Sequence, residues 1–352
     1  MMELTKRDST MIKGLAALLM VALHLFMKTG SEVYGTPLLW VSNDVPLVWY
    51  LGYMGEMCVS LYCMCTGYAL FLQFSATDEK NFQKKERKRL LRFLSHFWII
   101  LILFTIIGFF FDASHEMPGS FLKFICNFFL LEETYNGAWW FASTYVLFVL
   151  ISPLYLRLVR KRDSRVLFVV FAAIFCVYYL CEVFWGFKVE PYYWKGFLIK
   201  KVSDLWHVSF FYVEGMILAK ERVISRIRNW MEKKNIGNAS VLLTILIVTI
   251  VACVIRRSIL MHFLSTFYFV FFHLWKKPDK VETFFFFWGT HSTDIWLVHM
   301  FFYLGIFKDL VFIVKYPILI FCFMLSLCVL SSWVIGKITM VLQKCKLLLI
   351  RQ

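Results

Sequence analysis

Long runs of apolar residues, separated by short polar and basic stretches, recur along the whole chain. A helix needs about 17 to 25 such residues to cross a bilayer. Counting one crossing per run predicts about ten membrane-spanning helices, over roughly residues 10–28, 48–74, 93–111, 138–156, 165–185, 204–219, 238–255, 259–275, 292–312 and 317–336. No internal repeat and no Ser/Gly-rich linker divides the chain. The pattern therefore predicts an all-α polytopic membrane protein with its transmembrane helices in one bundle.

The composition agrees with this prediction. Hydrophobic residues make up 60% of the 352 residues, and the mean hydropathy of +0.68 is well outside the range of soluble globular domains. The net charge is +15, but Lys and Arg occur in short clusters between the apolar runs. Such clusters are typical of topology signals and not of a phosphate-binding groove. We therefore expect a lipid bilayer as a partner and no nucleic acid.

The distribution of the basic residues predicts the orientation. If the N-terminus is cytoplasmic, 28 of the 38 Lys and Arg residues fall in segments on the inner side of the membrane. This count favours both termini in the cytoplasm. We expect a multi-pass protein of a cell membrane, of bacterial origin. We expect one membrane domain over residues 1–340 and a short cytoplasmic tail over residues 341–352.

Two ionisable residues, Lys13 and His24, interrupt the first apolar run, Met11–Phe26. An ionisable group inside a span is costly unless it is used. The two residues are eleven positions apart, which places them on one stripe of a helix, about 16 Å apart along its axis. Burial favours a neutral imidazole, so His24 is a candidate general base. The alternatives are a core histidine bonded to a neighbouring carbonyl and a Lys13 side chain that snorkels to the inner interface.

A second candidate site lies where the third span begins. Arg89 and Arg92 are three residues apart and share one helical face. Two guanidinium groups in this arrangement can hold phosphates. The alternative is a topology signal or a contact with lipid headgroups, which is common for basic residues at an inner helix end. His96, four residues beyond Arg92, extends the same face.

Near the end of the chain, Gly289–His299 contains several polar residues. Ser292, Thr293 and Asp294 are typical of a helix N-terminus, and they predict that His299 lies inside the membrane. The pair His291 and Asp294 resembles a histidine whose ring is oriented by a carboxylate. The interpretation that we favour is capping and solvent contact at a helix entry.

The second span contains further polar residues and a glycine. Glu56 is the polar residue of Gly55–Leu70 that helix packing does not explain, whereas Gly67 permits close helix approach. The ten cysteines lie mostly in apolar segments and lack the spacing of a zinc site. We therefore expect packing cysteines and no metal.

Taken together, these motifs resemble those of acyltransferase family 3, integral-membrane enzymes of about ten spans that acylate cell-surface sugars. The resemblance covers nearly the whole chain. The family's first helix contains a cation followed, after ten residues, by a histidine, and Lys13 and His24 match this signature, with Lys13 where the commonest family members have Arg. Arg89 and Arg92 match the RxxR signature of the third span. The chain departs from the family at Ser60, where many members have an acidic residue.

The resemblance implies transfer of an acyl group, most often acetyl from acetyl-coenzyme A (acetyl-CoA), to a hydroxyl of a saccharide acceptor. It implies that Lys13, Arg89 and Arg92 hold the coenzyme A phosphates and that His24 is the base. Glu56 and His299 are the candidate substrate contacts. An acyl-histidine relay is an alternative mechanism.

Two other classes of function stay open from the residues alone. A multi-pass secondary transporter or flippase for a saccharide-type substrate also has about ten spans and buried polar residues. A non-catalytic sensor or assembly factor would keep the scaffold and tolerate the loss of His24. The sequence leaves the acceptor, the donors to the oxyanion and the oligomeric state open.

Overall fold

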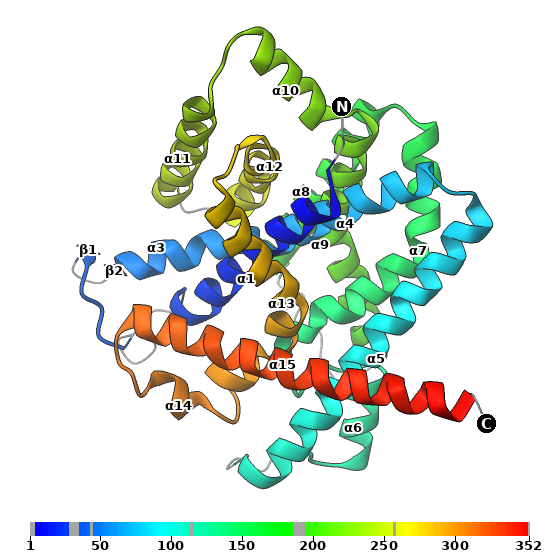
Figure 1. The fold of residues 1–352 in the computed structure, drawn as a ribbon, viewed down its shortest axis with the longest axis vertical. Helices are drawn as coiled ribbons and strands as arrows, with labels where there is room; N and C mark the ends of the chain where they lie inside the picture. The colour runs from blue at the N-terminus through cyan, green and yellow to red at the C-terminus, as the bar shows by residue number, and fades with distance from the viewer. Residues whose placement is uncertain are drawn as a thin grey trace.

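The computed structural model describes residues 4–27, 35–42, 45–112, 116–185, 194–255 and 258–350, and the protein in these ranges is almost entirely helical (Figure 1). The elements in chain order are α1 (Lys6–Phe26), β1 (Trp40–Ser42), β2 (Val45–Pro46), α3 (Leu47–Tyr53), the 3-10 helix η1 (Met54–Met57), α4 (Cys58–Ser75), α5 (Glu79–Phe111), α6 (Phe121–Phe128), the 3-10 helix η2 (Gly137–Trp139), α7 (Trp140–Lys161), α8 (Ser164–Trp185), α9 (Trp194–Lys220), α10 (Val223–Lys233), α11 (Asn238–Ile255), α12 (Ser258–Leu274), α13 (Asp279–Tyr303), α14 (Lys308–Phe312) and α15 (Pro317–Ile350). The two short strands pair antiparallel. The predicted all-α class is confirmed.

Six helical segments of the described residues are long and apolar enough to cross a membrane: Lys6–Phe26, Leu47–Ser75, Glu79–Phe111, Gly137–Lys161, Ser164–Phe184 and Pro317–Cys345. α11 and α12 are apolar but shorter. α9 and α13 are 27 and 25 residues long but contain more polar and charged residues. The chain is therefore an all-α membrane protein, and the count of ten spans stays a prediction.

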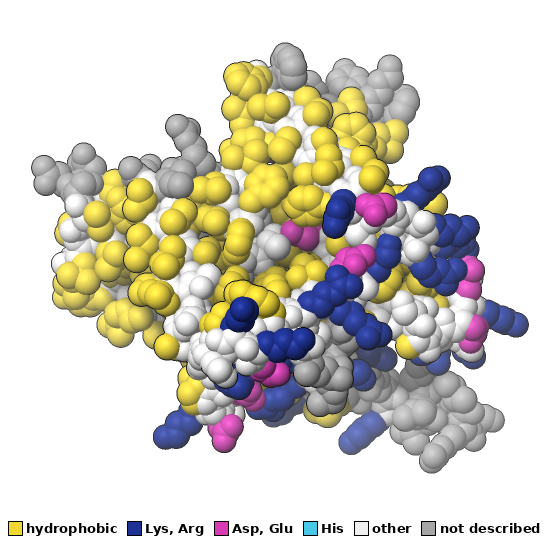
Figure 2. All heavy atoms as spheres, turned by 90° about the horizontal axis from the view of Figure 1, so that it is seen from above, with side chains coloured by type: hydrophobic (Ala, Val, Ile, Leu, Met, Phe, Trp, Pro, Cys, Tyr) yellow, Lys and Arg dark blue, Asp and Glu magenta, His cyan; other side chains and the backbone are white. Residues whose placement is uncertain are grey.

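Apolar side chains also cover much of the outer surface. Figure 2 shows a continuous cover of hydrophobic side chains beside a region where Lys and Arg gather. The exposed apolar residues include Phe109, Phe110 and Phe111 at the end of α5, which are 66%, 70% and 67% exposed. A soluble protein rarely exposes such large patches, so this surface is suited to contact with lipid.

The predicted span 292–312 is wrong in its position. α13 already begins at Asp279 and ends at Tyr303. The aromatic run 284–288 continues the apolar pattern toward the N-terminus, and Gly289 is accommodated inside the helix because it packs against α1. The predicted cap residues, Ser292, Thr293 and Asp294, therefore lie within the helix, and Ser292 Oγ donates to the carbonyl of Gly289 at 2.8 Å.

Two helix crossings without intervening side chains hold the centre of the bundle together. α1 crosses α13 where Gly14 meets Gly289, and a Cβ atom on either glycine would lie 2.1 Å or less from a backbone carbonyl oxygen of the other helix. α4 crosses α9 in the same way at Gly67 and Gly215, where the corresponding distance is 2.1 Å on both sides. Only glycine allows such close approach of two backbones. The predicted role of Gly67 is confirmed, and α1 is fixed against its neighbours.

Candidate functional site

A cavity of about 170 Å³ lies at the C-terminal end of α1. The side chains that line it come from α1, η1, α4, α7, α9, α12 and α13, with Ala138 of η2. Most of the lining is apolar and aromatic, and its ionisable or hydroxyl-bearing members include His24, Glu56, Tyr62, His207 and His262. A largely apolar pocket with a few convergent polar groups is the usual form of a binding or catalytic site.

His24 is in the last turn of α1 and borders this cavity. Its Nδ1 lies 3.4 Å from the hydroxyl of Tyr303. Close packing positions the helix end, because a Cβ atom on Gly55 would lie 2.3 Å from the carbonyl oxygen of Leu19. His24, the candidate base selected from the sequence, is therefore held in the wall of the cavity, and its Nδ1 lies near the Tyr303 hydroxyl.

His299 packs against His24. The two ring centroids are 4.8 Å apart, and His299 is fully buried. Its Nδ1 lies 2.7 Å from the carbonyl oxygen of Trp296, which only accepts, so Nδ1 carries the proton and Nε2 carries the lone pair. His299 does not border the cavity. The structure brings His299 into contact with His24, and a contact of His299 with a substrate stays a prediction.

Glu56 is brought to the same cavity as His24. It is half-buried in η1, the short helix that precedes α4, and its side chain borders the space that His24 borders. The sequence separates the two residues by 32 positions, and the contact of η1 with α1 unites them. The carboxylate can accept hydrogen bonds from a ligand inside the cavity.

Two further histidines, which sequence reasoning missed, border the cavity from α9 and α12. His262 Nδ1 lies 3.0 Å from the hydroxyl of Ser60. His207 stacks between Trp140 and Tyr178, with ring centroids 6.0 and 5.0 Å away. An ionisable residue in an apolar helix, the signal that revealed His24, also marks both of these positions.

The three candidate phosphate-binding cations, Lys13, Arg89 and Arg92, do not border this cavity. Lys13 is half-buried on α1, and its carbonyl oxygen accepts from the Tyr62 hydroxyl at 3.3 Å. The binding of the acyl donor's phosphates by these three cations stays a prediction.

Arg89 and Arg92 have different surroundings on α5. Arg89 is 31% exposed and pairs with the buried Glu86 at 3.2 Å. It also donates to Gln73 Oε1 at 3.2 Å. Arg92 is exposed, and no hydrogen bond or ion pair to another described residue involves it. Arg89 is thus held in place by α4 and α5, whereas Arg92 faces outward.

His96 and Asp294 join α5 to α13. His96 Nε2 pairs with one Asp294 carboxylate oxygen, and the hydroxyl of Ser332 donates to the other. His291 Nδ1 lies 2.8 Å from the same Ser332 hydroxyl. The interpretation of His291 and Asp294 as cap and solvent contacts is therefore wrong, because both side chains bond to α15 inside the helix bundle.

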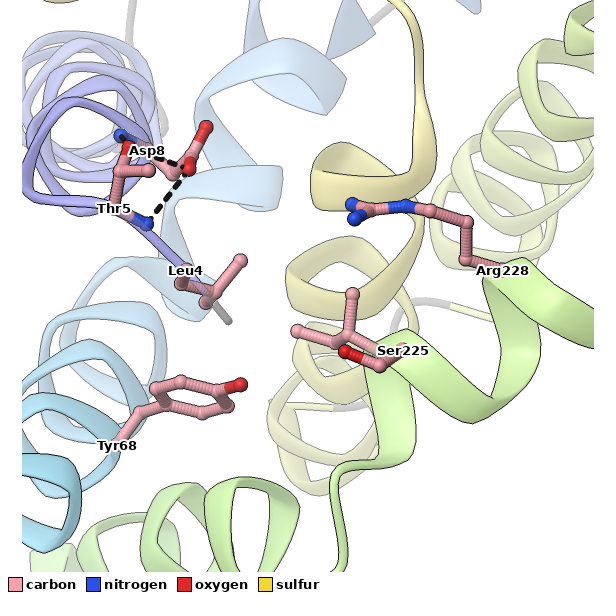
Figure 3. Close-up of a pocket in the computed structure, with 7 residues that line it drawn as sticks. Leu4, Thr5, Asp8, Tyr68, Ser225 and Arg228 are labelled. Atoms are coloured by element: carbon pink, nitrogen blue, oxygen red, sulfur yellow. Dashed lines mark hydrogen bonds between the residues drawn. The ribbon is translucent and has the colours of Figure 1, made fainter. Parts of the chain in front are cut away.

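A second cavity, of about 120 Å³, lies at the opposite end of α1. In Figure 3 Arg228 reaches into it from α10, the phenol of Tyr68 points into it from α4, and Asp8 bonds to Thr5 at the start of α1. Asp8 and His24 are 16 positions apart, which corresponds to about 24 Å along the helix. Each end of α1 thus has its own cavity.

Comparison with known proteins identifies a family. The family model described as an acyltransferase domain, that of acyltransferase family 3, matches residues 8–337 of the chain. A search of curated proteins finds no match, and a search of solved structures finds none.

Proposed function

The chain belongs to acyltransferase family 3 and is a membrane acyltransferase, and on this premise we propose that it moves an acetyl group from acetyl-CoA to a hydroxyl of a cell-surface or lipid-linked saccharide. The observation that carries the proposal is the place of His24. This residue is the one histidine of the first helix, and it borders a cavity between helices in which a thioester and an alcohol could meet. The family membership supports the acyltransferase activity, whereas the acetyl group, the acetyl-CoA donor and the saccharide acceptor are our proposal.

His24 would act as the general base. When its Nδ1–H is donated to the Tyr303 oxygen, Nε2 carries the lone pair and can take the proton of the acceptor hydroxyl. The acceptor oxygen then bonds to the thioester carbon, and the resulting tetrahedral intermediate expels the coenzyme A sulfur as the C–S bond breaks. The proton passes from His24 to the departing sulfur, so that the imidazole returns to its neutral form.

The surroundings of His24 suit transfer better than hydrolysis. Trp140, Phe141 and Trp296 border the same cavity, and Trp296 Nε1 donates to the carbonyl of Ala138 at 3.1 Å, which fixes the indole. An apolar and aromatic lining limits the access of water, which competes with the acceptor hydroxyl for the thioester.

A direct experiment tests this function. The purified protein in proteoliposomes is supplied with radiolabelled acetyl-CoA and a panel of octyl pyranosides, which mimic lipid-linked saccharides. We expect a labelled, alkali-sensitive pyranoside ester and one free coenzyme A thiol per ester. Movement of a pyranoside across the bilayer without ester formation would instead support the transporter or flippase alternative, and absence of both would contradict the proposal.

We also propose that both termini are cytoplasmic and that Lys13, Arg89 and Arg92 bind the donor phosphates. Charge-assisted hydrogen bonds between guanidinium groups and phosphates contribute about 1.5–3 kcal/mol each. We therefore expect Arg89→Ala and Arg92→Ala each to weaken acetyl-CoA binding about tenfold to 100-fold in calorimetry.

Controls separate binding from folding at this site. Arg89→Ala leaves the buried carboxylate of Glu86 without its ion-pair partner, so it is compared with the double variant Glu86→Gln/Arg89→Ala. Lys88→Ala removes an exposed charge from the same helix and should leave the affinity unchanged. Unchanged affinity in both arginine variants would mean that the arginines are topology signals.

A further inference from the structure

The wall of the cavity that His24 borders contains a second imidazole with a defined hydrogen bond, His262. We propose that His262 Nε2–H is a donor to the oxyanion of the tetrahedral intermediate, and that the hydroxyl of Ser60 sets the tautomer that makes this donation possible. The inference rests on the proposed function and names the catalytic group that stabilises the negative charge created when His24 removes the proton.

The surroundings of Ser60 determine the direction of its hydrogen bond. Ser60 is fully buried in α4, and its hydroxyl lies 3.0 Å from His262 Nδ1. A buried hydroxyl whose hydrogen has no acceptor destabilises the fold, and His262 Nδ1 is within reach to accept that hydrogen. Ser60 therefore donates, Nδ1 carries the lone pair, and the proton of the neutral imidazole is on Nε2.

The ring of His262 is held tightly by aromatic neighbours. The ring centroids of His207, Phe175 and Phe211 lie 5.2, 5.5 and 5.5 Å from that of His262. His207 is itself stacked on Trp140 at an interplanar angle of 4°. With Nδ1 bonded to Ser60, Nε2 is the nitrogen that this fixed ring can present to a ligand in the cavity. A donor that is already oriented stabilises developing charge without the cost of reorganisation.

His24 and His262 have different roles in this proposed mechanism, one as a proton acceptor and the other as a hydrogen-bond donor. His24 requires a lone pair toward the acceptor hydroxyl, and His262 offers a proton toward the thioester oxygen. Both side chains border the same cavity of about 170 Å³, and the proposal requires that one acetyl group in this cavity contact both. In this arrangement the Ser60 hydroxyl donates to His262 Nδ1, and Nε2–H is left for the ligand.

Variants at position 262 test the donor. We expect His262→Ala to lower kcat for acetyl transfer to octyl pyranosides about 100-fold, with the Kd for acetyl-CoA unchanged. His262→Gln, which offers an amide N–H in place of Nε2–H, should keep kcat within about tenfold of the wild type. Phe267→Leu, at a 50% exposed position of the same helix, is the matched control and should not change kcat.

Ser60→Ala tests the tautomer. Without the serine hydroxyl, His262 can place its proton on either nitrogen, so we expect kcat to fall about tenfold. An amide has no tautomers, and Ser60→Ala should therefore have no further effect in the His262→Gln background. A purely structural role of Ser60 would lower kcat equally in both backgrounds and would overturn the assignment of the tautomer.

Two results are decisive for the inference. If the wild type transfers acetyl and His262→Ala keeps its kcat within about twofold, His262 is not the donor, while the proposed function stands. If the wild type transfers no acetyl to any pyranoside, the proposed function itself fails. Should His262→Ala not fold, as judged by gel filtration, His262→Met preserves the side-chain volume without an N–H donor, and the same fall in kcat is expected.

Discussion

Replacing His24 with alanine should lower kcat for acetyl transfer about 10²-fold to 10⁴-fold, the usual contribution of a general base. The side chain borders the cavity, and the backbone of α1 is held by its glycine crossing with α13. We therefore expect the variant to fold and to bind acetyl-CoA with unchanged affinity. Thioester turnover with octyl pyranosides, together with calorimetry for the donor, measures the two effects separately.

Chemical rescue distinguishes a base from a structural side chain. Truncation at His24 enlarges the cavity, so added imidazole should restore part of the lost kcat in His24→Ala. The matched control is Leu15→Ala, which shortens a half-buried side chain of the same helix. The Leu15 side chain does not border the cavity, so this variant should retain nearly all activity. Full activity of His24→Ala would refute the assignment of the base.

Replacing Gly289 with leucine should lower the Tm of the protein strongly. A Cβ atom at this position would lie 1.9 Å from the carbonyl oxygen of Thr10 and 2.7 Å from its carbonyl carbon. These are backbone atoms of α1, and they cannot give way as the end of a side chain can. Overpacking a well-filled core costs about 1–3 kcal/mol, and a leucine at a crossing between two backbones must separate the helices.

Thermal unfolding in detergent measures this effect, and alanine variants calibrate it. Gly14→Ala, on the other side of the crossing, should lower Tm because its Cβ atom would lie 2.1 Å from the carbonyl oxygen of Phe285. Gly336→Ala, within α15, meets nothing within 4 Å and should keep or raise Tm, because alanine favours a helix by up to about 1 kcal/mol over glycine. Equal Tm values for all the variants would show that the crossing is not close.

The helical class could be predicted from the sequence, and the sequence alone also selects His24 as the candidate base. His24 stands out because an imidazole in an apolar run requires a reason, and that argument needs no tertiary structure. The same criterion applies to His207 and His262. It does not tell which helices meet, so the grouping of these residues around one cavity follows from the tertiary contacts of α1, α9 and α12.

The error in the predicted start of α13 also arises because the sequence does not show which helices are in contact. Ser, Thr and Asp at 292–294 are typical of a cap and predict too late a start for α13, whereas buried partners on α5 and α15 satisfy Asp294 inside the bundle. The spacing of Arg89 and Arg92 predicts one shared face. This prediction is not among the errors, since both residues lie on α5; the structure adds that Arg89 bonds to Glu86 and that Arg92 is exposed, and their role with phosphates stays a prediction.

The assignment of the reaction to His24 is tested most directly by a structure of the protein with acetonyl-CoA, a ketone analogue of the thioester that cannot lose its acyl group. We predict that the analogue's carbonyl lies in the cavity, with its oxygen within hydrogen-bond distance of His262 Nε2 and its carbonyl carbon beside His24. An analogue that binds with its carbonyl outside this cavity would contradict the assignment.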